Sequence, residues 1–258
     1  MSLADCFAAM DGVTVSRKAV KERDAMIKTK AVIFDMDGVL IDTEKYLIRF
    51  WCQAGQEAGY PFAREHGLMV RSLAGEYAEP RLKEILGQEF DYHRVRNRRK
   101  ELMQAHLEQY GVEKKPGVEE LLDYLHQIGL QTAVATATDR VRATAYLQEI
   151  GVYDQFDRII CATEVPHGKP QPDVYLYACR ELGLLPEECI AVEDAPNGIL
   201  AAYRAGVPVI MVPDQSQPDA ELKKLLYDQA DSLVQLKEKL EQRFHMNAVE
   251  ETAAGMGK

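Results

Sequence analysis

The stretch FDMDGVLIDTE, residues 34–44, decides the fold that we predict for this chain of 258 residues. It continues the apolar run 31–34, which is too short for a helix and rich in β-branched and aromatic residues, as buried strands are. If the backbone is still extended there, Asp35 and Asp37 project to the same side, because alternate residues of a strand share a face. Two carboxylates are therefore expected at the carboxyl end of a buried strand, where they are costly for a core and useful for metal-assisted chemistry.

Beyond residue 115 the sequence alternates between helical and strand patterns. Strands are predicted at 131–136, 157–161, 189–193 and 207–212, and helices at 117–128, 140–150, 172–183 and 196–205. Gly151, Gly183 and Gly206 follow three of these helices, where the backbone needs a positive φ. Repeated strand–helix units predict an α/β fold, a Rossmann-like parallel sheet with helices on both faces, in which the run 31–34 is a further strand.

The region between the first motif and residue 115 shows helical patterns, the longest at 92–110, and no convincing strand. We therefore expect an inserted all-helical cap domain at 45–114 and a core domain at 28–44 and 115–243. Two helices around a short strand near 231–234 are expected to close the core. The remaining segments are an N-terminal extension, 1–27, with a short helix predicted at 16–25, and a flexible tail, 244–258.

Composition and charge exclude several classes of function. The formal net charge of −10 disfavours a nucleic-acid partner, since phosphate backbones select basic surfaces. No apolar run approaches the roughly 20 residues needed to span a bilayer, and no secretory signal is evident. The five cysteines are scattered without a CxxC pair, which is typical of a cytoplasmic protein and not of a disulfide framework or a zinc site.

Polar residues follow the predicted strands at the edge where α/β sheets place their sites. Thr136, Ala137 and Thr138 end the second strand. Lys169 stands between Gly168 and Pro170, just before a predicted helix, and Glu193 and Asp194 end the predicted strand 189–193.

These residue types suit phosphoryl transfer. Asp35 and Asp194, with the Asp37 backbone carbonyl and Glu193, could hold Mg²⁺, which prefers oxygen ligands. Lys169 supplies a fixed positive charge, and the Thr136 hydroxyl and nearby backbone N–H groups can donate to phosphate oxygens. Asp37 can protonate the leaving oxygen and then activate water.

The set DxDG, Thr, GKPxPD and EDxxxG, in this order at strand ends, resembles the haloacid dehalogenase superfamily. FDMDGVLIDTE with a helical insertion directly after it is similar to the subgroup that contains β-phosphoglucomutase and small sugar-phosphate phosphatases. The resemblance covers about residues 30–235, nearly the whole chain.

The resemblance implies a role for each motif residue. Asp35 would be the nucleophile and Asp37 the general acid and base. The phosphoryl group would be bound by Gly38, Thr136, Ala137, Thr138 and Lys169. The magnesium site would be formed by Asp35, the Asp37 carbonyl, Glu193 and Asp194. The segment 45–114 would be a mobile cap that closes over the substrate.

The chain departs from the subgroup in its cap. By our count the histidine of the mutases is replaced by Leu47, which favours hydrolysis over phosphate transfer. The stretch 68–72 lacks the glycine usual in the cap loop, and its Arg71 is a candidate contact for a second charged group of the substrate. Lys45 lies near the place of a Schiff-base lysine, although a surface lysine is the simpler interpretation. Asp37 argues against dehalogenation, because dehalogenating members lack the second Asp.

Several residues also have a purely structural interpretation. Glu193 and Asp194 could cap the helix 196–205, and Thr138 and Asn197 could be turn or cap residues. Asp42 and Thr43 are expected to fix the hinge into the cap. The basic run 94–100 is interpreted as a solvated helix face, with attraction of anionic substrates as the alternative.

The sequence therefore predicts a magnesium-dependent phosphatase that hydrolyses a small phosphorylated metabolite, a sugar or polyol phosphate, through an aspartyl-phosphate. A β-phosphoglucomutase-like phosphomutase is the alternative within the same chemistry. A phosphate-responsive, receiver-like binding module is the alternative of another class, although receiver domains are smaller and have no cap.

Overall fold

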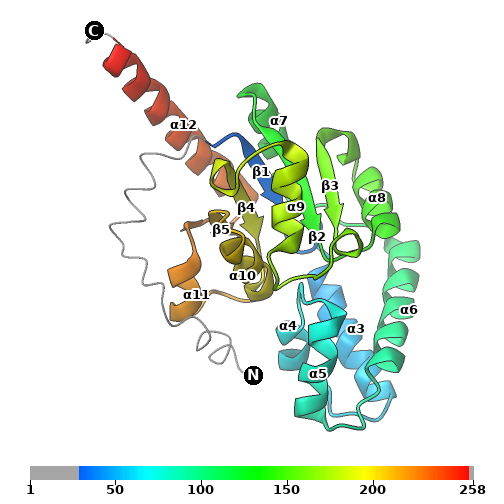
Figure 1. Ribbon diagram of the computed structural model, residues 1–258. Coiled ribbons are helices and arrows are strands. Elements are labelled where there is room, and N and C mark those ends of the chain that lie inside the picture. The colour runs from blue at the N-terminus through cyan, green and yellow to red at the C-terminus, as the bar shows by residue number, and fades with distance from the viewer. Residues whose placement is uncertain (1–28, 256–258) are drawn as a thin grey trace.

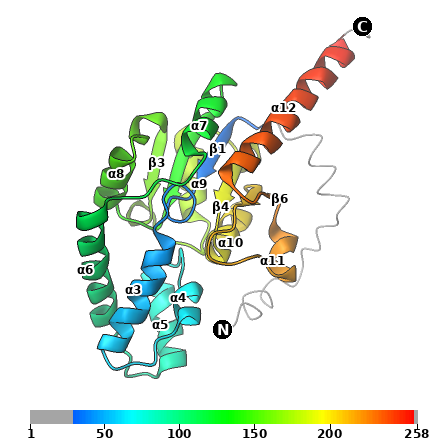
Figure 2. The ribbon, with the colours of Figure 1, turned by 180° about the vertical axis from the view of Figure 1, so that it is seen from behind.

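The computed structural model describes the backbone of residues 29–255 and the side chains of residues 29–244. Its centre is a six-stranded parallel sheet in the order β3-β2-β1-β4-β5-β6. The strands are β1 (Ala31–Phe34), β2 (Gln131–Thr136), β3 (Arg158–Cys161), β4 (Cys189–Glu193), β5 (Val209–Met211) and β6 (Asp228–Gln229). Helices cover both faces of this sheet, so the predicted Rossmann-like architecture is confirmed (Figures 1 and 2).

Strand β1 shows why the sheet needs helices on both faces. Its four residues are fully buried and point alternately to the two faces, as expected for a central parallel strand. Val32 and Phe34 pack with α7 (Val118–Gln127), α8 (Arg140–Glu149) and α12 (Leu233–Gly255). Ala31 and Ile33 pack with α9 (Asp173–Leu182), α10 (Pro196–Arg204) and α11 (Ala220–Leu225).

The position of β1 also places the site. It pairs with β2 on one side and β4 on the other, with Phe34 opposite both Val134 and Val192. The strand order therefore reverses at β1, with β2 and β3 on one side and β4, β5 and β6 on the other. Such a switch point is where open α/β sheets bind ligands. Asp35 follows Phe34 directly, so the first motif enters the crevice at this point.

The helical insertion expected after the first motif is present as α3 (Glu44–Glu57), α4 (Arg64–Met69), α5 (Gly75–Leu86) and α6 (Tyr92–Tyr110). These helices form a separate body below the sheet in Figure 1. They have their own core, built around Trp51, Phe62, Leu82 and Phe90. The limits 45–114 predicted for the cap remain a proposal that agrees with this grouping.

Two strands of backbone connect the cap to the core, and they are hydrogen-bonded to each other. The Asp42 N–H donates to the Glu113 carbonyl at 2.8 Å, and the Lys115 N–H donates to the Leu40 carbonyl at 3.0 Å. Lys115 Nζ joins this crossing to the core through Asp42, at 3.1 Å, and Asp214, at 2.6 Å. Asp42 therefore lies where the two linkers between cap and core meet, and its role as a hinge residue stays a prediction.

The end of the chain differs from the prediction. The short strand expected near 231–234 lies earlier, at β6, and the apolar residue Leu233 begins α12. The reason is a helix cap, because the Ser232 hydroxyl accepts a hydrogen bond from the Gln235 N–H at 3.1 Å. Leu233, Leu236 and Leu240 are then buried at helical spacing.

The terminal segments were predicted from sequence as an extension and a tail. The extension 1–27, with its helix at 16–25, lies outside the described residues. Helix α12 continues to Gly255, so much of the segment 244–258 has a helical backbone, and its flexibility stays a prediction. No helix of the described chain is long and apolar enough to cross a bilayer. The four cysteines of the described residues are free.

Candidate active site

The side chains predicted from the four motifs converge at the carboxyl ends of β1, β2 and β4. Asp35 and Asp37 follow β1, Thr136 ends β2, and Glu193 ends β4 with Asp194 directly after it. Lys169 reaches the same place from the loop before α9. All except Asp37 are almost completely buried, so the structure assembles charged groups where a core would normally be apolar.

Lys169 is the cation at the centre of this group. Its Nζ donates to Asp35 Oδ1 and to Glu193 Oε1, each at 2.6 Å, and to the Ala135 carbonyl at 2.9 Å. Burial alone would lower the pKa of Lys169, but the two carboxylates outweigh burial and raise that pKa above its ordinary value. Lys169 is therefore a permanent positive charge beside Asp35.

Asp35 has one occupied and one open carboxylate oxygen. Oδ1 accepts from Lys169, whereas Oδ2 is buried and has no hydrogen-bond partner. Burial raises the pKa of Asp35 to about 8; Lys169 opposes this rise and Glu193 adds to it. A buried carboxylate in this condition gains most from a cation at its open oxygen.

Asp37 is held differently, by two hydroxyl groups. The Thr43 hydroxyl donates to Oδ1 at 2.6 Å, and the Thr138 hydroxyl donates to Oδ2 at 2.8 Å. Thr138 therefore does more than form a turn, since it orients the second Asp of the motif. Thr136 supports it in turn, because its Oγ accepts the Thr138 N–H at 3.0 Å.

Asp35, Glu193 and Asp194 could hold a metal ion. One carboxylate oxygen of each lies within 4.8 Å of the others, and each residue also has one buried oxygen without a hydrogen-bond partner. Three oxygen donors with unmet polar atoms fit a hard divalent cation such as Mg²⁺. The side chain of Asp37 is not in this group, and a ligand role for its backbone carbonyl stays a prediction.

Two glycines allow the carboxylates to approach the backbone. A Cβ at Gly38, whose φ is +86°, would lie 2.5 Å from Asp194 Oδ2. A Cβ at Gly198, in the first turn of α10, would lie 2.1 Å from either oxygen of the Glu193 carboxylate. Glycine is thus required at both positions by space, and at Gly38 also by backbone conformation.

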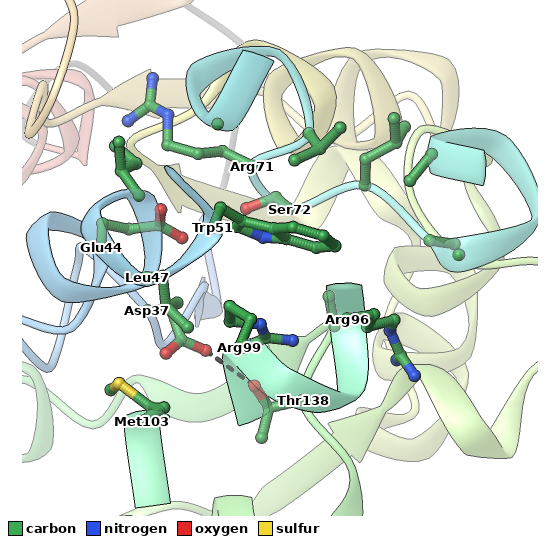
Figure 3. Close-up of a pocket in the computed structure, with 18 of the residues that line it drawn as sticks. Asp37, Glu44, Leu47, Trp51, Arg71, Ser72, Arg96, Arg99, Met103 and Thr138 are labelled. Atoms are coloured by element: carbon green, nitrogen blue, oxygen red, sulfur yellow. Dashed lines mark hydrogen bonds between the residues drawn. The ribbon is translucent and has the colours of Figure 1, made fainter. Parts of the chain in front are cut away.

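A pocket lies between these strand ends and the cap (Figure 3). Asp35, Asp37, Ala137 and Thr138 form its core side, whereas Gly38, Thr136 and Lys169 are not among its lining residues. From the cap it is lined by apolar side chains, including Leu47 and Trp51, and by the arginines Arg71, Arg96 and Arg99. No histidine of the described chain lines it, and Leu47 is among its lining residues.

Arg71 joins the cap to the metal-site carboxylates. It is buried; its Nη1 donates to Asp194 Oδ2 at 3.0 Å and its Nη2 donates to the Ser216 hydroxyl. Asn197 Nδ2 secures the same loop by donating to the Met69 carbonyl at 3.1 Å and the Arg71 carbonyl at 2.8 Å. The loop 68–72 has no glycine, and Ser72 adopts the positive φ, +53°, that a glycine would adopt more easily.

Lys45 is occupied elsewhere. Its Nζ pairs with Asp42 and, at 2.8 Å, with Glu113 at the hinge. It is absent from the residues that line the pocket. This geometry agrees with the interpretation as a surface lysine and leaves no group at that position for Schiff-base chemistry.

Sequence reasoning missed two groups that the structure adds to the site. Tyr175 donates its hydroxyl to Glu193 Oε1, and burial, followed by Glu193, raises its pKa well above the ordinary value. Glu44 is buried beside the pocket, and burial raises its pKa to about 8 against the effect of Arg71. Glu44 closes the first motif, which could have drawn attention to it, whereas nothing in the sequence distinguishes Tyr175 from a core aromatic.

Comparison with known proteins assigns the motifs to a family. The profile of the haloacid dehalogenase-like hydrolases matches residues 29–206. The chain is 33% identical over 187 residues to the putative phosphatase YhcW of Bacillus subtilis, covering 72% of this chain and 84% of that protein.

Two further relatives are similar over the same region. A phosphorylated carbohydrates phosphatase of Thermotoga maritima is 30% identical over 182 residues, which are 69% of this chain and 82% of that protein. The β-phosphoglucomutase of Bacillus subtilis is 32% identical over 200 residues, which are 73% of this chain and 85% of that enzyme.

Proposed function

The chain belongs to the haloacid dehalogenase-like hydrolases and is a phosphomonoester hydrolase, and we propose that it is a magnesium-dependent phosphatase. The proposed substrates are small sugar or polyol phosphates, and the proposed intermediate is an aspartyl-phosphate. The observation that carries the proposal is the state of Asp35. One of its oxygens is fixed by Lys169 and the other is open, next to a pocket that the cap closes.

In the first step, a carboxylate oxygen of Asp35 attacks the phosphorus of the ester. The bond between phosphorus and the ester oxygen breaks, and a new bond joins Asp35 to the phosphoryl group. Asp37, oriented by Thr43 and Thr138, gives its proton to the departing oxygen, so that the product leaves as an alcohol.

In the second step, water attacks the phosphorus of the aspartyl-phosphate. Asp37, now ionised, takes the proton of that water, inorganic phosphate leaves, and the carboxylate of Asp35 is restored. Lys169 stays charged throughout and stabilises Asp35 on both sides of the reaction. The Thr136 hydroxyl and the backbone N–H groups after β1 and β2 are the proposed donors to the phosphoryl oxygens.

Asp35, Glu193, Asp194 and the Asp37 carbonyl would hold Mg²⁺, which supplies charge neutralisation between the phosphate dianion and the carboxylate that attacks it. The requirement of a cation follows from the carboxylates themselves. Lys169 and Arg71 are the cations bonded to them in the described structure, and each carboxylate still has an oxygen without a partner.

The class of substrate rests on the pocket and the relatives. The T. maritima relative is named as a phosphatase of phosphorylated carbohydrates. Here the apolar side chains of Leu47, Trp51 and Met103 face the pocket and offer a surface for a small carbon skeleton. We accordingly propose a small phosphorylated metabolite as the partner, and a cytoplasmic location with it.

A phosphomutase is the rival activity, since one relative is named β-phosphoglucomutase. A mutase must keep its phosphoenzyme away from water until the product returns. The cap of this chain presents Leu47 where the mutases have a histidine, and this favours hydrolysis. A receiver-like module is disfavoured by the cap, which encloses the phosphoryl site instead of leaving a signalling surface.

The test is phosphate release from a panel of sugar phosphates, polyol phosphates and nucleotides, with Mg²⁺ and with a chelator. We expect release that needs Mg²⁺ and falls by at least about 10⁴-fold in Asp35→Asn. Mg²⁺ should also raise the melting temperature of the wild type and not of Asp194→Asn. Isomerisation of a hexose 1-phosphate without net phosphate release would establish the mutase instead. Unchanged turnover in a folded Asp35→Asn would overturn the nucleophile.

A further inference from the structure

Three arginines from two different domains converge on the pocket beyond the reacting carboxylates. Arg96 and Arg99 come from the cap helix α6, where a spacing of three places both on the same face. Arg142 comes from the first turn of the core helix α8, and all three line the pocket. Figure 3 shows Arg99 beside Asp37 and Thr138, with Arg96 further along the cavity.

Arg99 is the member whose charge is least satisfied. Its side chain is 8% exposed, and its buried Nε has no hydrogen-bond partner. Its guanidinium lies over the Trp51 ring at 5.3 Å, and no carboxylate lies within ion-pair distance of it in residues 29–244. Burial, followed by Arg142 and Arg96, lowers its pKa to about 10. An anion in the pocket would relieve this cost.

The neighbours of Arg99 add to the positive charge. Arg142 is paired with Asp139 at 2.7 Å, and Arg96 has no carboxylate at ion-pair distance within the described residues. The pKa of Lys100 is also lowered, first by burial and then by Arg96, Arg142 and Arg99. Together with Lys100, the three arginines form a group of four cations with one directly paired carboxylate, and such a group attracts an anion.

The cluster begins at Arg99, beside Asp37, and extends from there along the pocket to Arg96 (Figure 3). None of the three arginines is ion-paired with Asp35, Glu193 or Asp194 within the described residues, whereas Lys169 and Arg71 are. In Figure 3 Arg96 lies across the pocket from Asp37, and the apolar side chain of Trp51 is drawn between the levels of Arg71 and Arg99. The pocket therefore has a polar end at Asp35, an apolar middle and a cationic wall.

We propose that Arg96, Arg99 and Arg142 form a second anion-binding site, so that the preferred substrate carries, besides its scissile phosphate, a second anionic group, either phosphate or carboxylate. This rests on the proposed phosphatase function for its first anion. Because two of the three arginines belong to the cap, the second anion also joins cap to core, and the closed state is favoured by the substrate that bears both charges.

The experiment compares glucose 6-phosphate with two doubly anionic relatives, glucose 1,6-bisphosphate and 6-phosphogluconate. For the wild type with Mg²⁺ we expect kcat/KM to be at least about tenfold higher for one of the pair, mainly through KM. A higher kcat/KM for glucose 1,6-bisphosphate identifies the second anion as phosphate, and a higher kcat/KM for 6-phosphogluconate identifies it as carboxylate. Arg99→Gln should bring the ratio close to one. Arg96→Gln is the second variant, because its side chain is less buried. Arg94→Gln, exposed on the same helix, is the matched control and should keep the wild-type ratio.

Binding of the same compounds to Asp35→Asn, measured by calorimetry, separates this proposal from the proposed function. If the wild type hydrolyses all three esters with similar kcat/KM, the second anion-binding site is overturned, whereas the proposed phosphatase activity stands. Tighter binding of the doubly anionic compound without turnover of any ester supports the second site and overturns the phosphatase. An equal loss with all three compounds in Arg99→Gln overturns the proposal, because the arginines would then serve the scissile phosphate.

Discussion

Two buried cations of this molecule differ in whether carboxylates contact them. Lys169, at the strand ends of the core, contacts two carboxylates and a backbone carbonyl. Arg99, on the cap helix that faces it across the pocket, is almost as buried and has no carboxylate at ion-pair distance in the described chain. Both charges are costly to bury, so each must be offset, one by the protein itself and the other by something that enters the pocket.

The difference separates chemistry from recognition. In the core, Lys169 joins Asp35 to Glu193, so these groups are positioned before any substrate arrives. The cap leaves Arg99 without a carboxylate at ion-pair distance in the described residues, so its affinity depends on which anions the substrate brings. A substitution in the core should therefore change the turnover of every substrate, whereas a substitution in the cap should change the order of preference among substrates.

The largest difference is expected when each cation is replaced by methionine. Lys169→Met leaves Asp35 and Glu193 buried without their cation and should lower the free energy of unfolding by about 3–5 kcal/mol. Arg99→Met removes a charge that has no carboxylate partner and should change it by less than about 1 kcal/mol in either direction. Urea unfolding of both variants measures this. Similar losses at the two positions would remove the contrast on which the account is built.

The next effect sharpens the description of the core. Gly198→Ala places a methyl group at the Glu193 carboxylate and should cost about 1–3 kcal/mol of stability through overpacking. Because Glu193 is bonded to Lys169, a shift of Glu193 should also displace Lys169, and phosphatase activity should fall for all substrates by the same factor. Thermal melting and a panel of esters test this. An unchanged melting temperature would mean that Glu193 has room that the structure does not show.

The smallest effect concerns the hinge between the two regions. Lys115 is paired with Asp42 and Asp214 and is mostly buried, whereas Lys45, in the same linker crossing, is more exposed. Lys115→Met should cost about 1 kcal/mol of stability, and Lys45→Met less, since solvent screens exposed pairs. Equal costs, measured by urea unfolding, would show that burial does not govern these pairs.

The core and its site could be predicted from sequence because each feature is local. Asp35 and Asp37 follow a strand that four apolar residues specify, and a parallel sheet then brings its strand ends together without further information. The same holds for Glu193, Asp194 and Lys169, whose predicted positions the structure brings within hydrogen-bond or metal-ligand distance of Asp35.

The residues with which the cap lines the pocket could not be predicted from sequence, because they depend on how its helices pack. Five of the seven residues in the run 94–100 are basic, and only the docking of α6 shows that Arg96 and Arg99 face the pocket while Arg94 faces solvent. Arg142 joins them from another domain, 43 residues after Arg99 in sequence. Arg71 was considered as a contact to substrate, and in the structure it is bonded to Asp194, which no pattern in the sequence indicates.

The most direct measurement is the trapping of the phosphorylated protein during turnover. A reaction with a phosphate ester labelled at the phosphoryl group is quenched in acid, reduced with borohydride to convert an aspartyl-phosphate into homoserine, and digested for mass spectrometry. The account predicts labelled protein before reduction and homoserine at position 35 after it, with neither in Asp35→Asn. Steady turnover of the ester with no labelled protein, or with the modification at another residue, would contradict it.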